Sequence, residues 1–193
     1  MSEELGALEV PLVVCDANVF YSIVLTDLLL SLGVAGLFRP RWTAHIHAEW
    51  MRNLQANNPA LEPAKIERRR ALMDAAIEDC LITGYEPLIP TLQLPDANDR
   101  HVLAAAIHAQ AQVIVTYNLR DFPAATLAPH NLTAQHPDEF LTALTGQEPA
   151  AVVAVLEEMR ARKTRPPLTM EELVQKIANQ KLPHFVTRLQ TLL

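Results

Sequence analysis

Short apolar segments alternate with helical segments along the first two thirds of the chain, and this alternation restricts the fold more than any other feature. The segment LVVC ends at Cys15, and the segment VIVT ends at Thr116. Both are short, rich in β-branched residues and free of charge, like strands that are buried on both faces. Strands that alternate with helices form a parallel sheet with helices on both faces. We therefore expect an α/β fold with a parallel sheet of about four to five strands.

The individual elements follow from periodicity and from start and stop signals. Strands are expected at about 11–15, 80–84 and 111–116, with a weaker one at 130–135 and a loop or short strand at 38–43. Helices are expected at about 17–31, 44–56, 62–79, 99–110 and 137–144. Thr43 is a candidate cap for the second helix, and Pro137 suits the first turn of the last one.

Length and composition are those of an ordinary globular protein. The chain has 193 residues, half of them hydrophobic, a net charge of −6 and two cysteines, Cys15 and Cys80. The acidic start MSEELGALEV lacks the basic and apolar regions of a secretory signal, and no apolar run approaches the roughly 20 residues that span a membrane. Two cysteines make neither a disulfide framework nor a zinc-type cluster. We expect a cytoplasmic protein without a membrane partner.

Acidic residues stand shortly after two of the expected strands. Asp16 follows LVVC directly, with Asn18 two residues later, and Asp121 follows VIVT by five residues. Each aspartate alone could be an ordinary turn residue. Ligands of open α/β sheets, however, bind at the carboxyl ends of the strands. The placement therefore makes both aspartates candidates for a functional site at that edge.

The segment LPDANDRHVLAAA puts Asp96 and Asp99 at the start of a helix. Capping explains such a pair, with Asp96 as the cap and Asp99 at the third helical position. Asp99, however, shares its helix face with four apolar residues, which are Val102, Leu103, Ala106 and Ile107. An inward carboxylate is costly unless its charge is compensated, and a metal ion compensates it better than a helix N-terminus does.

Glu49 presents a similar choice, because it adjoins the apolar stripe of its own helix. That stripe consists of Trp42, Ile46, Trp50 and Leu54. Alone, Glu49 would be a solvent-facing acid, but together with the aspartates it completes a set of acids on four separate elements. Carboxylates in close proximity repel one another, and a divalent cation removes the repulsion. Ligands that are all oxygen suit Mg²⁺ or Mn²⁺ rather than zinc.

Four motifs of the chain resemble those of the PIN-domain nucleases in order, spacing and local context. They are VVCDANVFYS, the glutamate in HAEW, LPDANDRHVLAAA and VIVTYNLRDF, and they span about residues 11–135. The family's four acids then correspond to Asp16, Glu49, Asp99 and Asp121. The polar residues of its last motif correspond to Thr116 and Asn118. For Asp96 three roles stay open: a helix cap, a support behind the ligands, or a ligand of a second ion.

The resemblance is strongest to the ribonuclease toxins of bacterial VapBC toxin–antitoxin modules, particularly those with a helical C-terminal extension. It implies a PIN-like three-layer α/β/α fold and an endoribonuclease that uses Mg²⁺ or Mn²⁺ to hydrolyse RNA phosphodiester bonds. Such an ion orients water and stabilises the charge that builds up in the reaction. The resemblance also implies an antitoxin protein as partner and a homodimer.

Basic residues gather in the first half of the chain, although the protein as a whole is acidic. The candidates for RNA contact are Arg39, Arg41, Arg52, Arg68, Arg69 and Arg70. A second basic cluster, RARKTR, occupies 160–165. Local basic patches on an acidic protein are compatible with a polyanionic substrate. Each patch could equally be a solvated helix face.

Other functions fit parts of the pattern. Haloacid-dehalogenase-like phosphohydrolases also begin with a strand and an Asp-x-Asp motif, but here the stretch is DAN and no downstream lysine motif follows. A catalytically weak PIN scaffold that binds RNA or protein is a second alternative, against which the presence of all four acids counts. The absence of a glycine-rich turn excludes a P-loop or dinucleotide fold. The seven histidines are scattered and suggest no metal site.

The pattern changes from Gln147 onward. Three amphipathic helices are expected at about 148–162, 169–179 and 183–192, separated by RPP and KLP. We therefore predict a nuclease domain at 1–146 and a helical C-terminal extension at 147–193. Short helices cannot bury their apolar faces alone, so these must pack on the core, on a second copy of the chain or on a partner. We expect the extension to provide a protein-binding surface and no catalytic residue.

Overall fold

The computed structural model describes residues 10–193 and contains a parallel sheet of four strands. The strands are β1 (Leu12–Cys15), β2 (Arg39–Arg41), β3 (Val113–Val115) and β4 (Thr133–Gln135). Their order in the sheet is β2-β1-β3-β4, and all neighbours are parallel. The expected number and direction of the strands are confirmed. The expected strand at 80–84 is wrong: it makes only a one-residue bridge, between Leu81 and Trp42.

The failure of that strand has a local cause. Trp42 donates its amide hydrogen to the Cys80 carbonyl and accepts one from the Ile82 amide, so the pairing lasts for a single residue. Two residues beyond Ile82, Gly84 has a φ of +80° and turns the chain away. An apolar run of this length does not distinguish a full strand from a short buried bridge.

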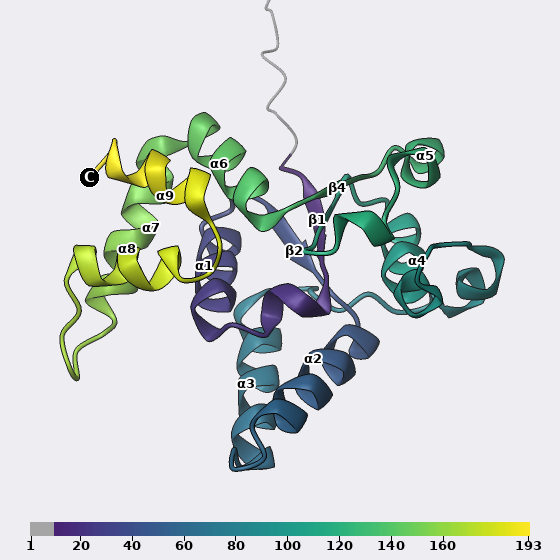
Figure 1. Cartoon of the computed structure of the whole chain (residues 1–193), viewed down its shortest axis with the longest axis horizontal. Coiled ribbons are helices and arrows are strands. Elements are labelled where there is room, and N and C mark those ends of the chain that lie inside the picture. Colours follow the sequence, from purple (N-terminus) through teal and green to yellow (C-terminus); the bar gives the residue numbers. More distant parts are fainter. Residues whose placement is uncertain (1–9) are drawn as a thin grey trace, which may run out of the picture.

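Helices cover both faces of the sheet. Helix α1 (Ile23–Val34) packs against β2, whereas α4 (Arg100–His108) packs against β1 and β3. In Figure 1 they lie on opposite sides of the strands, α1 on the left and α4 on the right. The chain leaves β1 toward β2 and later returns to β3 on the other side of β1. The order of the strands therefore reverses between β1 and β3, which is where ligands of such sheets bind.

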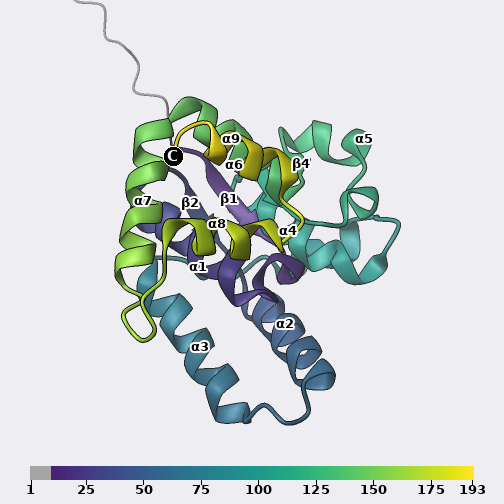
Figure 2. The same ribbon diagram turned by 60° about the vertical axis from the view of Figure 1, so that its left-hand side comes forward.

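Helices α2 (Ala44–Asn57) and α3 (Pro63–Ala76) form a hairpin that projects below the sheet in Figures 1 and 2. Thr43 caps α2 as predicted, since its hydroxyl accepts the Ile46 amide at 3.1 Å. A buried network holds the hairpin together: His47 Nε2 lies 2.8 Å from Asp74 Oδ1, and its Nδ1 accepts Trp50 Nε1–H at 2.9 Å. His47 is thus a structural residue of the core.

The segment expected to be one helix from 17 to 31 is divided. Residues Ala17–Phe20 form a 3₁₀ turn (η1), and α1 begins only at Ile23. Ser22 causes the new start, because its hydroxyl accepts the Leu25 amide at 3.3 Å. Further short elements are η2 (Glu86–Thr91), η3 (Ala97–Asp99), η4 (Leu119–Asp121), α5 (Ala124–Leu127) and η5 (Ala128–His130).

The C-terminal helices are α6 (Pro137–Gln147), α7 (Pro149–Ala161), α8 (Met170–Ala178) and α9 (Pro183–Gln190). Figure 2 shows α7 and α8 against α1, and α9 beside α6. The apolar stripes of the extension are largely buried, with Leu156, Ile177 and Phe185 fully so, and these residues belong to the same hydrophobic core as the sheet. Of the three packing partners left open by the sequence, the chain's own core is therefore the one that covers these stripes.

The joint between α6 and α9 is made by one buried carboxylate. Asp138 Oδ1 accepts the Phe185 amide at 2.8 Å, and Oδ2 accepts the His184 amide at 3.1 Å. Nδ1 of the His184 ring also lies 2.7 Å from Oδ2. Asp138 thereby supplies the acceptor that the first turn of α9 lacks within the helix.

In residues 10–193, no helix combines the length and the apolar character needed to cross a membrane.

Candidate active site

Asp16 lies at the carboxyl end of β1, beside β3, and only 3% of it is exposed. Its amide donates to the Val115 carbonyl at 3.1 Å, which carries the β1–β3 pairing one residue past the strand. One carboxylate oxygen accepts the Ala17 amide at 2.6 Å. The other accepts Asn18 Nδ2 at 2.6 Å and Thr116 Oγ1 at 2.7 Å. The strand end, the 3₁₀ turn and β3 thus fix this carboxylate together.

Three polar residues predicted from the sequence surround Asp16 differently. Asn18 Nδ2 also donates to Thr116 Oγ1 at 2.9 Å, and Asn18 Oδ1 accepts the Tyr117 amide at 3.1 Å. Thr116 is fully buried and accepts the Asn118 amide at 3.0 Å. The Asn118 side chain is exposed. Asn18 and Thr116 therefore position Asp16, whereas Asn118 contributes its backbone to this network.

Asp96 and Asp99 belong to the turn η3 that precedes α4. Asp96 is exposed, and its carboxylate accepts the Asn98 amide at 2.8 Å. It thus caps the 3₁₀ turn, which is the first of the three roles left open for it. Asp99 makes no side-chain cap, so the reciprocal capping pair does not form. The capping explanation accounts for Asp96 and leaves the partly buried carboxyl group of Asp99 unexplained.

The charges that act on Asp99 indicate which of the predicted acids lie near it. Burial raises the pKa of Asp99 to about 7, assisted by the negative charges of Asp16, Asp96, Asp121 and Glu49. These residues come from α2, η3 and η4, from the cap position before η3 and from the turn after β1. Since charges act on one another noticeably only at short range in a screened medium, the acids share one edge of the molecule. We call Asp16, Glu49, Asp99 and Asp121 the carboxylate edge.

The charge on Asp16 is also disfavoured. Burial raises its pKa to about 6, against the hydrogen bonds from Thr116 and Ala17, and the negative charge of Glu49 raises it further. Glu49 is 29% exposed and lies 3.4 Å from Nε2 of His101. Asp121 is 16% exposed, with the Arg120 Nε 3.9 Å away. Little positive charge therefore compensates the carboxylate edge.

The donor set suits a hard divalent cation, because it consists of carboxylate oxygens that repel one another. Within residues 10–193, no three His, Cys, Asp or Glu side chains are arranged as a ready-made metal centre. In the same residues, the carboxylates of Glu49, Asp99 and Asp121 accept no hydrogen bond of normal geometry. They can therefore turn toward an ion without breaking one, whereas Asp16 is held in place.

One residue of this region was missed by the sequence interpretation. His101 lies between Glu49 and His45, with its ring centroid 5.4 Å from that of His45. Its Nδ1 is buried and has no hydrogen-bond partner. His45 in turn contacts the Tyr85 hydroxyl, at 3.0 Å from Nδ1. His101 lies in the first turn of α4, and this position was the sequence signal that could have revealed it.

The six arginines proposed to contact RNA fall into two groups. Arg69 donates to the Phe20 carbonyl and to Thr26 Oγ1 and lies over the Trp50 ring, 4.9 Å from its centroid. Arg70 pairs with Glu67 and Asp74, and Arg41 donates to the Glu78 carbonyl at 3.1 Å. These three arginines make contacts within the protein. The exposed ones are Arg39, Arg52 and Arg68.

The C-terminal extension reaches the carboxylate edge through Tyr117. The Tyr117 hydroxyl donates to the Gln180 carbonyl, between α8 and α9, at 2.8 Å. The ring of Tyr117 packs edge-on against His136, with centroids 4.9 Å apart. Burial and the charge of Asp138 raise the pKa of Tyr117 to about 12, so it stays a hydrogen-bond donor. The C-terminal extension therefore helps to hold Tyr117, the residue between Thr116 and Asn118, in place.

Comparison with known proteins agrees with this architecture. The profile of the PIN domain matches residues 12–120, and that of the VapC50 C-terminal domain matches residues 137–191. A protein of Mycobacterium tuberculosis (strain ATCC 25618 / H37Rv) named "Putative ribonuclease VapC50" is 38% identical over 109 residues, which are 56% of this chain and 63% of that protein. The chain thus aligns with less than two thirds of the relative's length. No solved structure gives a significant match.

The two profiles are separated by residues 121–136. The PIN-domain profile runs from β1 through β3 into η4, and the second profile begins with α6 and ends after α9. The fold class is the one expected from the motifs. Because the PIN-domain profile covers more than half of its length, this chain belongs to the PIN-domain family, with a VapC50-type C-terminal domain behind the PIN domain.

Proposed function

We propose that this protein is a metal-dependent endoribonuclease and the toxin of a toxin–antitoxin pair. The observation that carries the proposal is the coupling of Asp99 to the other acids, since the negative charges of four carboxylates act on Asp99 near the point where the strand order reverses. Such a concentration of charge is costly in a protein without a bound cation. The membership in the PIN-domain family and the likeness to a relative named as a ribonuclease support the same activity.

In this proposal, Asp16, Glu49, Asp99 and Asp121 hold one or more Mg²⁺ or Mn²⁺ ions. When bound, the ion supplies an activated water and stabilises the charge that develops on the phosphate. The chain's own contribution is positional: Asn18 and Thr116 fix the orientation of Asp16, and Tyr117 fixes Asn18 through its amide. In the hydrolysis a P–O bond of the RNA breaks, and water supplies the new oxygen.

A covalent intermediate on cysteine is not part of the proposal. Cys15 stands directly before Asp16, but it is fully buried, and burial together with the charge of Asp16 raises the pKa of its thiol far above the usual range. Burial likewise raises the pKa of Cys80, to about 11. Neither thiol therefore provides a thiolate at neutral pH, and direct attack by water is the simpler route.

The test is cleavage of a structured RNA by the wild-type protein in Mg²⁺ or Mn²⁺, beside Asp99→Asn and Asp96→Asn. We expect Asp99→Asn to lower kcat by at least about 100-fold, which corresponds to roughly 3 kcal/mol of barrier. Asp96→Asn is the matched control at the same turn, and it should keep activity within about fivefold. Full activity in EDTA, or equal losses in both variants, would contradict the proposal.

The partners follow from the same family relationship. We propose RNA as the substrate, an antitoxin protein that covers or flanks the carboxylate edge, a homodimeric assembly and a cytoplasmic setting. We also propose a functional division at Gly146 and Gln147, with the nuclease residues before it and the extension after it. Co-purification of the chain with the product of a neighbouring small gene, followed by loss of cleavage in the complex, tests the toxin assignment.

A further inference from the structure

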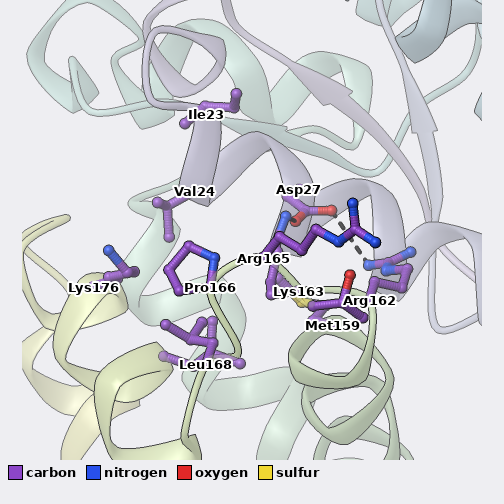
Figure 3. A pocket seen from close by; sticks show the side chains of 12 residues that line it. Ile23, Val24, Asp27, Met159, Arg162, Lys163, Arg165, Pro166, Leu168 and Lys176 are labelled. Carbon is purple, nitrogen blue, oxygen red and sulfur yellow. Dashed lines mark hydrogen bonds and ion pairs between the residues drawn. The ribbon is translucent and has the colours of Figure 1, made fainter.

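The first of two neighbouring hollows lies between the start of α1 and the segment that joins α7 to α8. Its volume is about 470 Å³. In Figure 3, Lys176 stands on one side of it and Arg165, Arg162 and Lys163 on the other. A single acid, Asp27, faces these cations, and it is shared by Arg162, at 3.3 Å, and Lys163, at 3.0 Å. Arg165 and Lys176 have no ion-pair partner in the described part of the chain.

The second hollow continues the first along α1 toward α3 and has a volume of about 330 Å³. Its cations from α3 are Lys65, Arg68 and Arg69, and it shares Ile23 and Lys163 with the first hollow. Together the two hollows contain seven of the chain's 16 lysines and arginines and one of its 22 acids. We call this surface the α1 basic groove.

A charge distribution of this kind selects the class of ligand. The chain has a net charge of −6, so the positive charge in the α1 basic groove is a local feature rather than a general property of the surface. A polyanion is the complementary partner. The floor is apolar and accessible, with Ile23 68% exposed and Leu72 61% exposed. Ribose and base faces of a nucleic acid can lie on such a floor while the phosphates meet the rim.

The carboxylate edge gives a physical reason why RNA would also be bound at a second place on the surface. Without a bound cation its acids repel an approaching phosphate backbone, so cations elsewhere on the surface would add free energy of RNA binding that the edge alone does not supply. The α1 basic groove is suitably placed, because Ile23 begins α1 only seven residues after Asp16. A strand bound at the sheet edge would continue over the start of α1 toward α8 and α3.

We infer that the α1 basic groove binds the phosphates of RNA outside the segment that is cut, with Arg68, Arg165 and Lys176 as its available cations. This inference rests on the proposed function, since it names where that substrate is held. It also assigns part of the RNA grip to the C-terminal extension, which supplies Arg165 and Lys176. The extension would then serve substrate affinity without providing any group that reacts.

The test compares two double variants on an Asp16→Asn background, so that the RNA stays intact. Arg165→Ala/Lys176→Ala removes two groove cations. Lys181→Ala/Arg188→Ala removes two exposed cations of the extension that line neither hollow. The probe is a fluorescein-labelled RNA stem–loop with single-stranded arms, and the Kd is measured by anisotropy between 50 and 200 mM salt without divalent ions. Circular dichroism checks that all variants are folded.

We expect the groove variant to raise Kd at least fivefold, and the slope of log Kd against log salt to fall by about one to two, since each lost phosphate contact removes roughly 0.7 to 0.9 of slope. The control should change Kd less than twofold. Equal Kd values and slopes in the two variants would overturn the inference and leave an acidic protein segment as the ligand to test.

Because binding is measured without cleavage, failure of the nuclease proposal and failure of this inference are distinguishable. A wild-type chain that binds the stem–loop through the groove but never cuts it supports the groove and contradicts the nuclease. A chain that cuts RNA with an unchanged KM in the Arg165→Ala/Lys176→Ala variant supports the nuclease and contradicts the groove.

Discussion

Two aspartates of this protein are equally buried and have opposite electrostatics. Asp16, at the carboxylate edge, is 3% exposed, and Asp138, at the joint of α6 and α9, is 4% exposed. Burial raises the pKa of both. At Asp138 the hydrogen bonds from Phe185 and His184 outweigh burial, so its pKa is lowered. At Asp16 the hydrogen bonds from Thr116 and Ala17 do not outweigh burial, and its pKa rises to about 6.

The difference lies in what surrounds each carboxylate. Asp138 accepts hydrogen bonds from two amides and contacts an imidazole. Asp16 also accepts three hydrogen bonds, but its burial outweighs them and the negative charge of Glu49 acts on it as well. The negative charge of Asp138 is therefore compensated by groups of the protein itself. The carboxylate edge lacks positive charge, and this lack is what a bound cation would correct. The same low solvent exposure thus has opposite consequences for two aspartates, because their neighbours differ and because Asp138 lies near the surface, where its partner His184 is 79% exposed.

The largest expected effect on stability is at the joint. Asp138→Asn removes the charge that three donors share and leaves donors without a full partner in a buried place. We expect the free energy of unfolding to fall by about 2–3 kcal/mol and Tm to fall by roughly 5–10 °C. Asp99→Asn is the comparison at the edge, and it should leave the stability unchanged or slightly higher. Urea unfolding at pH 7 measures both.

The pH dependence gives the control for this prediction. A carboxyl group with a lowered native pKa stabilises the protein above its unfolded pKa of about 3.9, and this contribution is lost as the pH falls through the native pKa. The gap in the free energy of unfolding between wild type and Asp138→Asn should therefore narrow below about pH 4, where the Asp138 carboxylate takes up a proton. A gap that stays unchanged below pH 4 would contradict the role assigned to Asp138.

The second effect is stabilisation by the ion itself. Mg²⁺ at roughly 10 to 30 times its Kd should raise the free energy of unfolding of the wild type by about 1–2 kcal/mol. Asp138→Asn should keep this increment, because its carboxylate lies outside the edge, and Asp99→Asn should lose most of it. Thermal unfolding in MgCl₂ against NaCl of equal ionic strength measures the difference. An equal increment in Asp99→Asn would mean that the ion binds elsewhere.

The smallest effect concerns the contact between the two regions. Tyr117→Phe removes only the hydroxyl that donates to the Gln180 carbonyl, and it should lower the free energy of unfolding by about 1 kcal/mol. If the extension positions the edge, kcat should also fall several-fold while KM stays constant. Restoring the hydroxyl should restore both. A variant that loses stability but keeps kcat would show that the edge is independent of the extension.

Much of the fold was predictable, because short uncharged runs and helical periodicity report burial directly. LVVC and VIVT became β1 and β3, and the three helices of the extension were expected where they occur. The errors arose where a local sequence pattern has two solutions. The run at 80–84 pairs through one residue only, and Ser22 starts a helix that hydrophobicity alone would start at 17.

The polar residues around Asp16, including Asn18 and Thr116, were predictable from the sequence, whereas the distant contact that holds Tyr117 was not. Asp16 stands out in the sequence because an acid directly follows a buried strand. The role of Tyr117 does not, since its partner Gln180 is 63 residues away and offers a backbone carbonyl. Arg69 illustrates the same limit: its charge suggested RNA, but the fold uses it to tie Phe20 and Thr26 to α3. Side-chain type does not reveal a partner distant in the chain.

The hydrogen bond between Thr116 and Asp16 joins residues that are 100 positions apart. During synthesis at about 5–20 residues per second, β1 therefore waits roughly 5–20 s before its partner strand has been made. Pairings of this sequence separation also form slowly, because a long loop must close first. A nascent chain consequently carries Asp16 without Thr116, Asp99 and Asp121 until more than half of the chain has been made. In the ribonuclease proposed above, this delay would postpone assembly of the carboxylate edge to the later part of synthesis.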